Sequence, residues 1–298
     1  MSESDSLVGR SYETSILREA LARVVEPNAS PEAVLVSGFS GVGKTSLVRS
    51  VFGEAALSRQ IVLASGKFDQ SNGATHPYSA IHSATKELCD QLRDVPATTF
   101  DALSDEERDL MCNVLPSFTT IFPRKPDNNG AQSSHQTPNQ WTFIRFASLF
   151  RMFLSIASSS SRPVVLFLDD LQWADDASRK LLDSMFADEK LTNFLLLGLV
   201  REGETTTYSP PDRALMNVTK LVLSALTLTQ TCEFVSNYLG QSESSFKELG
   251  SLIHKHTQGN PYFVLQIMES LRRKRLVSDN TGLDSVELEQ AITKSKDV

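Results

Sequence analysis

Short apolar segments alternate with longer segments of helical period along the first 225 residues of the chain. The short segments are apolar at nearly every position and rich in β-branched residues, which is typical of strands covered on both faces of a parallel sheet. The segments between them carry apolar residues at spacings of three and four, which predicts helices packed on that sheet. The sequence therefore predicts an α/β fold with a doubly wound, mainly parallel sheet of five strands flanked by helices. The predicted strands are Ala33–Ser37, Ile61–Ser65, Val164–Leu168, Phe194–Val200 and Lys220–Leu223, and the predicted helices include Glu13–Val25, Tyr78–Arg93, Trp141–Ile156 and Ala177–Ala187.

Strand patterns stop after Leu223, and the remaining segments have a helical period, which predicts a small helical domain after the sheet. Residues 124–140 are polar and rich in Pro, Asn, Ser and Gln, which predicts a mobile surface loop. The predicted helices are Thr229–Leu239, Ser245–His256 and Pro261–Arg273, and the expected domains are a sheet domain over residues 1–225, a helical domain over residues 226–276 and, over residues 277–298, a polar tail or the start of a further domain.

The composition of the chain argues against several classes of protein and partner. The 298 residues include 29 Lys and Arg against 36 Asp and Glu, so the net charge of −7 provides no chain-wide field for nucleic acid or an anionic membrane. The apolar runs are far shorter than the roughly 20 residues that span a bilayer. Cys89, Cys112 and Cys232 are isolated, which excludes a disulfide framework and a cysteine zinc site. We expect a cytoplasmic protein without membrane or nucleic-acid partners.

A glycine-rich segment follows the first predicted strand directly and precedes an apolar helical pattern. Gly38–Thr45 reads GFSGVGKT and fits the pattern GxxxxGK[ST] in its required strand–loop–helix setting. Such a loop wraps a phosphate with backbone N–H groups, while Lys44 contacts the β- and γ-phosphates and the hydroxyl of Thr45 binds Mg²⁺. The alternative is a glycine-rich turn with a solvated lysine. The expected nucleotide-binding residues here are Gly38, Ser40, Gly41, Val42, Gly43, Lys44, Thr45 and Ser46.

Two carboxylates follow the third predicted strand, Val164–Leu168. Ligands bind at the carboxyl edge of an open α/β sheet, so both side chains are candidates for the chemistry of a bound phosphate. Asp169 suits a metal-side carboxylate that helps hold Mg²⁺. Asp170 suits a base, or an orienting group, for the water that attacks the γ-phosphate. The alternative is that the two acidic residues begin a surface turn.

The segment Phe167–Asp175 (FLDDLQWAD) resembles the hhhhDDLQWAD signature of one group of P-loop ATPases. That group is the signal-transduction ATPases with numerous domains (the STAND class), which includes the origin-recognition-like AAA modules of large sensor kinases, adenylyl cyclases and transcriptional regulators. The resemblance runs from about residue 7 to about residue 276. Four further segments resemble motifs of the group in the same order, namely Leu7–Arg10 (LVGR), Gly66–Gln70 (GKFDQ), Leu196–Arg201 (LLGLVR) and Gly259–Pro261 (GNP).

The resemblance implies a position and a role for Arg201. We call Gly38–Thr45 the phosphate loop. The strand that ends at Arg201 would lie between the strand that precedes the phosphate loop and the strand of Asp169. Arg201 would then lie near the γ-phosphate, take part in catalysis and distinguish ATP from ADP. The residues alone leave the alternative of a solvated arginine at the end of a strand.

The resemblance also implies contacts to adenine. Val8, Gly9 and Arg10 would cover the base, and Pro261 would contact it as the helical lid closes. From the residues alone, the first three form an ordinary turn into a helix. Gly259 and Pro261 are likewise explained as the end of one helix and the first turn of the next.

Two residues after the carboxylates have structural explanations. Trp173 is expected to be a packing anchor beneath the carboxyl edge of the sheet. Asp175 is expected to cap the helix Ala177–Ala187. The basic segment Arg272–Arg275 is the best nucleic-acid candidate, but a solvated helix end explains it better.

The sequence departs from many AAA+ ATPases, which carry Asp-Glu where this chain has Asp169 and Asp170. Aspartate is one methylene shorter, which predicts slow turnover. Arg179 and Arg213 are candidates for an arginine finger by position only, and a winged helix at best begins at Leu276–Leu288.

The leading hypothesis is an ATP/ADP conformational switch with slow Mg-dependent hydrolysis, joined to protein partners or fused sensor and effector domains and able to form an ATP-dependent oligomer. The alternatives are a DNA-associated origin-recognition-like ATPase and a nucleotide-binding scaffold without hydrolysis.

Overall fold

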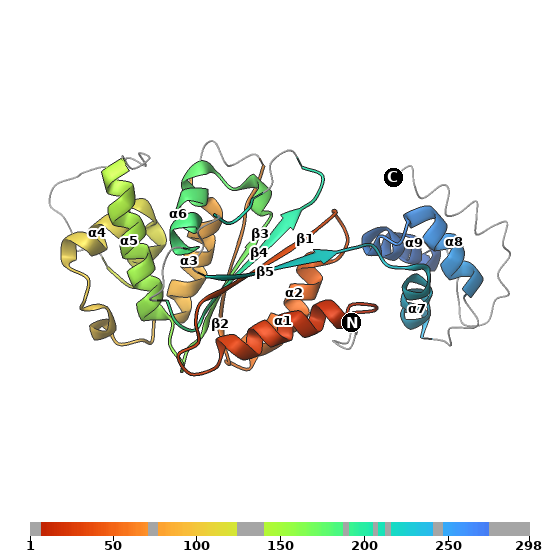
Figure 1. Cartoon of the computed structure of the whole chain (residues 1–298), viewed down its shortest axis with the longest axis horizontal. Helices are drawn as coiled ribbons and strands as arrows, with labels where there is room; N and C mark the ends of the chain where they lie inside the picture. Colours follow the sequence, from red (N-terminus) through yellow and green to blue (C-terminus); the bar gives the residue numbers. More distant parts are fainter. Residues whose placement is uncertain are drawn as a thin grey trace. The chain divides into compact units, whose positions relative to one another are not determined.

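Five strands form a single all-parallel sheet that is flanked by helices (Figure 1). The strands are β1 (Glu32–Gly38), β2 (Val62–Lys67), β3 (Val164–Asp169), β4 (Phe194–Arg201) and β5 (Asn217–Leu223), in the order β2-β3-β4-β1-β5. This confirms the predicted α/β class and the insertion of the Arg201 strand between the phosphate-loop strand and the Asp169 strand. The structure is a computed structural model that describes residues 7–70, 77–123, 140–186, 191–204, 208–211, 216–240 and 247–273.

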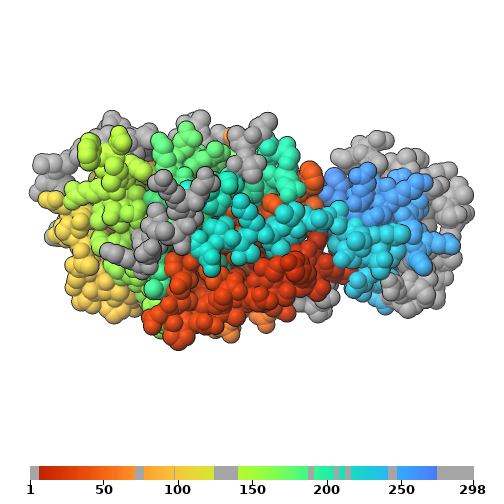
Figure 2. Space-filling model, in the orientation of Figure 1, coloured from red at the N-terminus to blue at the C-terminus, as the bar shows by residue number. Residues whose placement is uncertain are grey.

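The register of the sheet brings particular strand ends together. β2 and β3 pair in parallel with Lys67 beside Asp169, and β3 and β4 pair with Leu168 beside Gly198. β3 is buried at every residue before Asp169, as its continuous apolar pattern predicts. β5 is an edge strand with several exposed residues, and its atoms (cyan) lie on the visible surface in Figure 2.

The predicted helices are present with small shifts of their ends. They are α1 (Ser11–Val24), α2 (Lys44–Leu57), α3 (Ser79–Gln91), α5 (Gln140–Ala157), α6 (Asp176–Phe186), α7 (Leu228–Leu239), α8 (Lys247–Thr257) and α9 (Pro261–Arg273). None of the helices in the described ranges combines the length and apolar character that a bilayer crossing requires.

Three elements between α3 and α5 were not predicted. They are η1 (Ala97–Phe100), α4 (Asp105–Val114) and η2 (Pro116–Thr120). α4 begins at a capping box in which Ser104 and Glu107 bond each other's backbone N–H groups. Aromatic rings fill the space beneath these elements, with the Phe118 and Phe153 centroids 4.8 Å apart. The Ser-x-x-Glu spacing was the available signal, but the short polar helix has little apolar periodicity.

The chain divides into two compact units. The first unit comprises Met1–Thr14, Gly38–Leu47 and Val222–Val298, and the second comprises Ser15–Ser37 and Val48–Leu221. In the first unit, α7, α8 and α9 share a core that includes Val235, Leu249, Ile253, Val264 and Met268. The second unit holds the larger core beneath the sheet. The domain boundaries at residues 225 and 276 stay predictions, and the expected tail and residues 124–139 of the expected loop lie outside the described residues.

Candidate functional site

Two glycines in the loop between β1 and α2 have backbone conformations that other residues rarely adopt. The φ angle is +80° at Gly41 and +94° at Gly43. A side chain at Gly41 would also collide, because its Cβ would lie 2.6 Å from Oδ1 of Asn260. Left-handed residues within a tight turn help successive N–H groups to point inward and form an anion-binding concavity. The loop therefore has the conformation that its glycine spacing predicts for phosphate binding.

The side chain of Lys44 is held inside this loop. Its Nζ donates to the carbonyl oxygen of Gly38 at 2.7 Å and to that of Phe39 at 3.0 Å, and the residue is 9% exposed. Lys44 begins the 14-residue helix α2, and the predicted ligands Thr45 and Ser46 follow in its first turn. The start of a helix presents N–H groups and the positive end of the helix dipole to an anion. The first unit thus combines an ammonium group, a hydroxyl and a helix start in one short segment.

The buried guanidinium of Arg10 is bonded to the backbone of the loop. It donates to the carbonyl oxygen of Val42 at 3.1 Å and to that of Ser224 at 2.7 Å, and it pairs with Glu13 at 3.2 Å. Beside it, the amide of Gln230 donates to the carbonyl oxygen of Gly9 at 3.1 Å. The LVGR segment therefore braces the phosphate loop. The contact of Val8, Gly9 and Arg10 with adenine stays a prediction.

The GNP segment also contacts the phosphate loop. The side-chain amide of Asn260 donates to the carbonyl oxygen of Ser40 at 2.8 Å, and the N–H of Tyr262 donates to that of Gly41 at 3.2 Å. Gly259 is left-handed, with φ +75°, and α9 begins at Pro261, which confirms the predicted helix end and helix start. Sequence reasoning missed Asn260, although it lies inside the motif. The contact of Pro261 with adenine stays a prediction.

The acidic pair lies in the second unit. Asp169 ends β3, and its Oδ1 accepts a 2.9 Å hydrogen bond from the N–H of Asp170. Asp170 is left-handed, with φ 56° and ψ 45°, and precedes the short helix η3 (Leu171–Trp173). This turn buries the Asp170 side chain while Asp169 remains partly exposed. The two adjacent carboxylates therefore have different surroundings, and their different roles stay predictions.

Asp170 is surrounded by three groups that neutralise or bond its carboxylate. Lys67 Nζ lies 3.3 Å from Oδ2, Arg201 Nη2 lies 3.5 Å from Oδ1, and the amide of Gln172 donates to Oδ1 at 2.9 Å. The structure thus brings the predicted residues Asp170 and Arg201 together. Lys67 and Gln172 were quoted within motifs, but no role was assigned to them. The signal for Lys67 was its place at the end of β2, opposite Asp169.

The predicted packing anchor Trp173 has a specific contact. The guanidinium carbon of Arg201 lies 4.9 Å from the ring centroid of Trp173. Asp175 accepts from the N–H of Ser178 at 2.9 Å and from its hydroxyl at 2.6 Å, which confirms the predicted cap of α6. The N–H of Tyr78 also donates to Asp175, at 3.2 Å. Burial, assisted by the Asp175 charge, raises the pKa of the Tyr78 hydroxyl to about 12.

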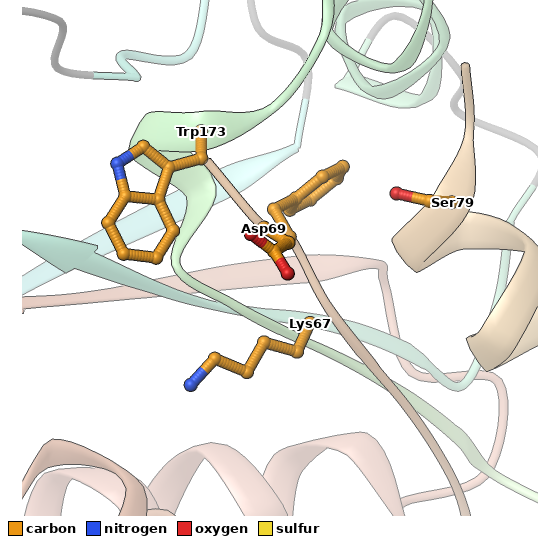
Figure 3. Close-up of a pocket in the computed structure, with 5 residues that line it drawn as sticks. Lys67, Asp69, Ser79 and Trp173 are labelled. Carbon is orange, nitrogen blue, oxygen red and sulfur yellow. The ribbon is translucent and has the colours of Figure 1, made fainter. Parts of the chain in front are cut away.

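An open pocket of about 550 Å³ adjoins this network. Figure 3 shows Lys67 at the end of β2, Asp69 on the segment that follows it, Ser79 at the start of α3 and Trp173 on η3. Phe68 also lines the pocket, so three consecutive residues of the GKFDQ motif, Lys67, Phe68 and Asp69, face it. Of the arginine-finger candidates, Arg179 donates to the carbonyl oxygen of Gln172 at 3.2 Å, and Arg213 lies outside the described residues.

The residues present fit a magnesium ion better than a metal held by protein alone. Thr45 offers a hydroxyl oxygen and Asp169 a carboxylate oxygen, which are ligands that Mg²⁺ prefers. No group of three or more His, Cys, Asp and Glu side chains able to hold a metal occurs in the described part of the chain. Mg²⁺ in nucleotide sites usually completes its coordination with phosphate oxygens and water, so it needs few ligands from the protein.

A model of the AAA ATPase domain family matches residues 6–197 of this chain. Over 180 residues the chain is 29% identical to hybrid signal transduction histidine kinase G of Dictyostelium discoideum. That match covers 60% of this chain and 5% of the kinase, so the chain spans about one twentieth of this relative's length.

Solved structures of low identity share the fold. Drosophila ORC bound to DNA superposes with a TM-score of 0.54 at 14% identity, covering 97% of this chain and 66% of that chain. A mutant of RuvB from Thermotoga maritima superposes with a TM-score of 0.51 at 14% identity, covering 98% of this chain and 71% of that chain. Both likenesses support the arrangement of sheet and helices described above.

Proposed function

The chain belongs to the AAA ATPase domain family, and we propose from this premise that it is an ATP/ADP conformational switch of signal transduction with slow, Mg-dependent hydrolysis. The observation that carries the proposal is the loop between β1 and α2. It combines left-handed Gly41 and Gly43, the inward-held Lys44 and a helix start within a single short segment. A triphosphate is the anion that such a loop suits in this family.

Nucleotide binding would exchange contacts that the loop already makes. Lys44 Nζ would leave the carbonyl oxygens of Gly38 and Phe39 for the β- and γ-phosphates. Thr45 and Asp169 would hold the magnesium ion, which neutralises phosphate charge when bound. β1 and β3 belong to one parallel sheet, and parallel strands end at a common edge, where α/β sheets bind ligands.

Slow hydrolysis is supported by the surroundings of Asp170. The carboxylate already contacts Lys67 and Arg201 and accepts a hydrogen bond from Gln172, so an attacking water has to compete with these partners for its oxygens. Asp170 is also one methylene shorter than glutamate, which reduces its reach toward an attacking water. A carboxylate with these restraints suits a module that holds ATP for a long time between turnovers.

A switch of this kind is energetically feasible. Reversing a 1:99 balance of two conformations needs about 5.5 kcal/mol of preferential binding. Charge-assisted hydrogen bonds contribute roughly 1.5–3 kcal/mol each, so a few contacts unique to the γ-phosphate suffice. Lys44 and Arg201 are the side chains proposed to make such contacts, and Asn260 joins the GNP segment to the same loop.

The signalling context rests on the similarity to the Dictyostelium kinase, of which this chain matches only a small part. We propose that the module works in a cytoplasmic assembly with sensor and effector domains, either fused or as protein partners, and that ATP favours its oligomerisation. Cys89, Cys112 and Cys232 are buried and lie far apart in the sequence, which suits a reducing compartment.

The first experiment is to purify the chain, identify any nucleotide that co-purifies, and measure ATP and ADP binding by calorimetry with and without Mg²⁺. We expect micromolar or tighter binding that requires the phosphate loop. Failure of both nucleotides to bind a folded protein would refute the proposal.

Single-turnover measurement of bound ATP then separates a slow ATPase from a scaffold, because a scaffold releases no phosphate over hours. Fluorescence anisotropy with duplex DNA at low salt tests the DNA-associated alternative. Salt-dependent binding would favour that alternative.

A further inference from the structure

The contact between Trp173 and Arg201 is an arrangement that the proposed chemistry does not itself require. The guanidinium carbon of Arg201 lies over the indole ring, 4.9 Å from its centroid. Nη2 of the same guanidinium lies 3.5 Å from Oδ1 of Asp170. A guanidinium above an aromatic face is attracted by the ring quadrupole, most strongly for tryptophan. Arg201 is therefore held by two partners that attract it in different ways.

The position of the backbone that carries Arg201 is fixed separately. Gln172 is 1% exposed, and its Oε1 accepts a 2.9 Å hydrogen bond from the N–H of Arg201 while its Nε2 donates to Asp170. Gln172 therefore fixes the end of β4 and the carboxylate of Asp170 in one frame. Within this frame, the Trp173 ring and the Asp170 carboxylate together orient the flexible part of the Arg201 side chain.

No hydrogen bond of the indole N–H to a described residue explains why a tryptophan stands at position 173. Its N–H is buried and has no hydrogen-bond partner among the described residues, so a leucine or phenylalanine would avoid an unsatisfied donor. What tryptophan adds is the large, electron-rich face that Arg201 occupies.

We infer that Trp173 is a positioning residue that holds the Arg201 guanidinium beside Asp170, ready to move to the γ-phosphate, and so sets the preference of the site for ATP over ADP. The inference rests on the proposed function. A stacked guanidinium keeps its charge and loses little side-chain freedom when it transfers to the phosphate, because its orientation is already restricted. ADP lacks the γ-phosphate, so Trp173 contributes nothing to ADP binding.

The test compares Trp173→Leu, Trp173→Phe and Trp141→Leu in the 298-residue chain. Trp141 is the other tryptophan and lies exposed at the start of α5, so it is a matched control. Calorimetry gives the affinity of each variant for ADP and for a non-hydrolysable ATP analogue. We expect Trp173→Leu to lose about threefold to tenfold of the preference for the ATP analogue, with ADP affinity unchanged. Trp173→Phe keeps a ring face and loses less, and Trp141→Leu loses nothing.

A second readout does not depend on affinity. In a Trp141→Phe background, all tryptophan emission comes from Trp173. We expect the ATP analogue to change this emission and ADP to leave it unchanged, and Arg201→Leu to abolish the difference. This measurement keeps the inference testable if Trp173→Leu fails to fold.

The outcomes are distinct. Wild-type protein that binds neither nucleotide overturns the proposed function, and the inference with it. Protein that binds both nucleotides overturns the inference alone if Trp173→Leu weakens both equally or leaves the ratio within twofold of wild type. Emission that responds equally to both nucleotides also overturns it.

Discussion

Lys67 at the end of β2 lies 3.3 Å from the carboxylate of Asp170, which follows β3 directly. The parallel register of the two strands, with Lys67 beside Asp169, brings these residues together. With Arg201 on its other oxygen, the buried Asp170 lies beside two cations. The two ion pairs differ in exposure, because the Lys67 side chain is 65% exposed and that of Arg201 is 29% exposed.

This difference predicts unequal contributions to stability. Lys67→Met should change the free energy of unfolding by less than about 1 kcal/mol, because water screens an exposed pair. Arg201→Met should cost about 1–3 kcal/mol, because it removes the less exposed partner of a buried carboxylate. Urea denaturation measures both. In an Asp170→Asn background the cost of Arg201→Met should shrink, and a cost that persists in full would contradict the ion-pair explanation.

The phosphate loop and the acidic pair should separate binding from turnover. Lys44→Ala should abolish ATP binding, since it removes the ammonium group that the loop holds in place. Asp170→Asn should keep binding and lose single-turnover hydrolysis, because an amide cannot accept the proton of water. Calorimetry and phosphate release measure the two effects. Unchanged affinity in the lysine variant would refute the nucleotide site.

Arg10 should act through the conformation of the loop. Arg10→Ala leaves the carbonyl oxygens of Val42 and Ser224 without their donor, which should cost about 1–3 kcal/mol of stability and weaken nucleotide binding. The control is Arg18→Ala, which removes an exposed arginine from α1, the helix that directly follows Arg10. Thermal denaturation and calorimetry check the pair of variants, and equal effects at both positions would argue against a bracing role.

Two glycines provide a matched test of packing. A Cβ at Gly66 in β2 would lie 2.0 Å from the backbone oxygen of Ala80, so Gly66→Ala should destabilise the protein by at least about 2 kcal/mol. A Cβ at Gly53 within α2 would meet nothing within 4 Å, so Gly53→Ala should stabilise it by about 0.4–1 kcal/mol. Chemical denaturation decides, and similar effects at both sites would contradict the packing of α3 on β2.

Stability should fall in alkaline solution because of a buried thiol. Burial raises the pKa of Cys89 from its ordinary value of 9.0 to about 12. The unfolded chain therefore releases this proton first, and stability is lost as the pH rises from about 9 toward 12. In Cys89→Ala the loss should begin nearer pH 10, where the raised pKa of Tyr78 takes effect. Denaturation midpoints of both proteins between pH 8 and 11 measure the pH at which the loss begins. The same onset in the wild-type protein and in Cys89→Ala would contradict the prediction.

Local patterns in the sequence determined the strands, most helices and the phosphate loop. Buried strands have continuous apolar runs and helices have apolar residues at a period near 3.6, so both are recognisable from neighbouring residues. The conformation of the loop also depends on neighbouring residues, since Gly41 and Gly43 allow its left-handed turns and Lys44 bonds carbonyl oxygens within it. α4 was missed because only Met111 and Cys112 of its residues are buried.

Only the tertiary structure decided which side chains share a partner. Asp170 meets Lys67 from β2 and Arg201 from β4, and Arg10 reaches the loop carbonyl of Val42. The type of a residue gives its charge and shape. The order and register of the strands decide which charges that are distant in the sequence become neighbours. The sequence thus determined which charged and polar groups this protein carries, and the sheet decided that the carboxylate of Asp170 lies between two cations.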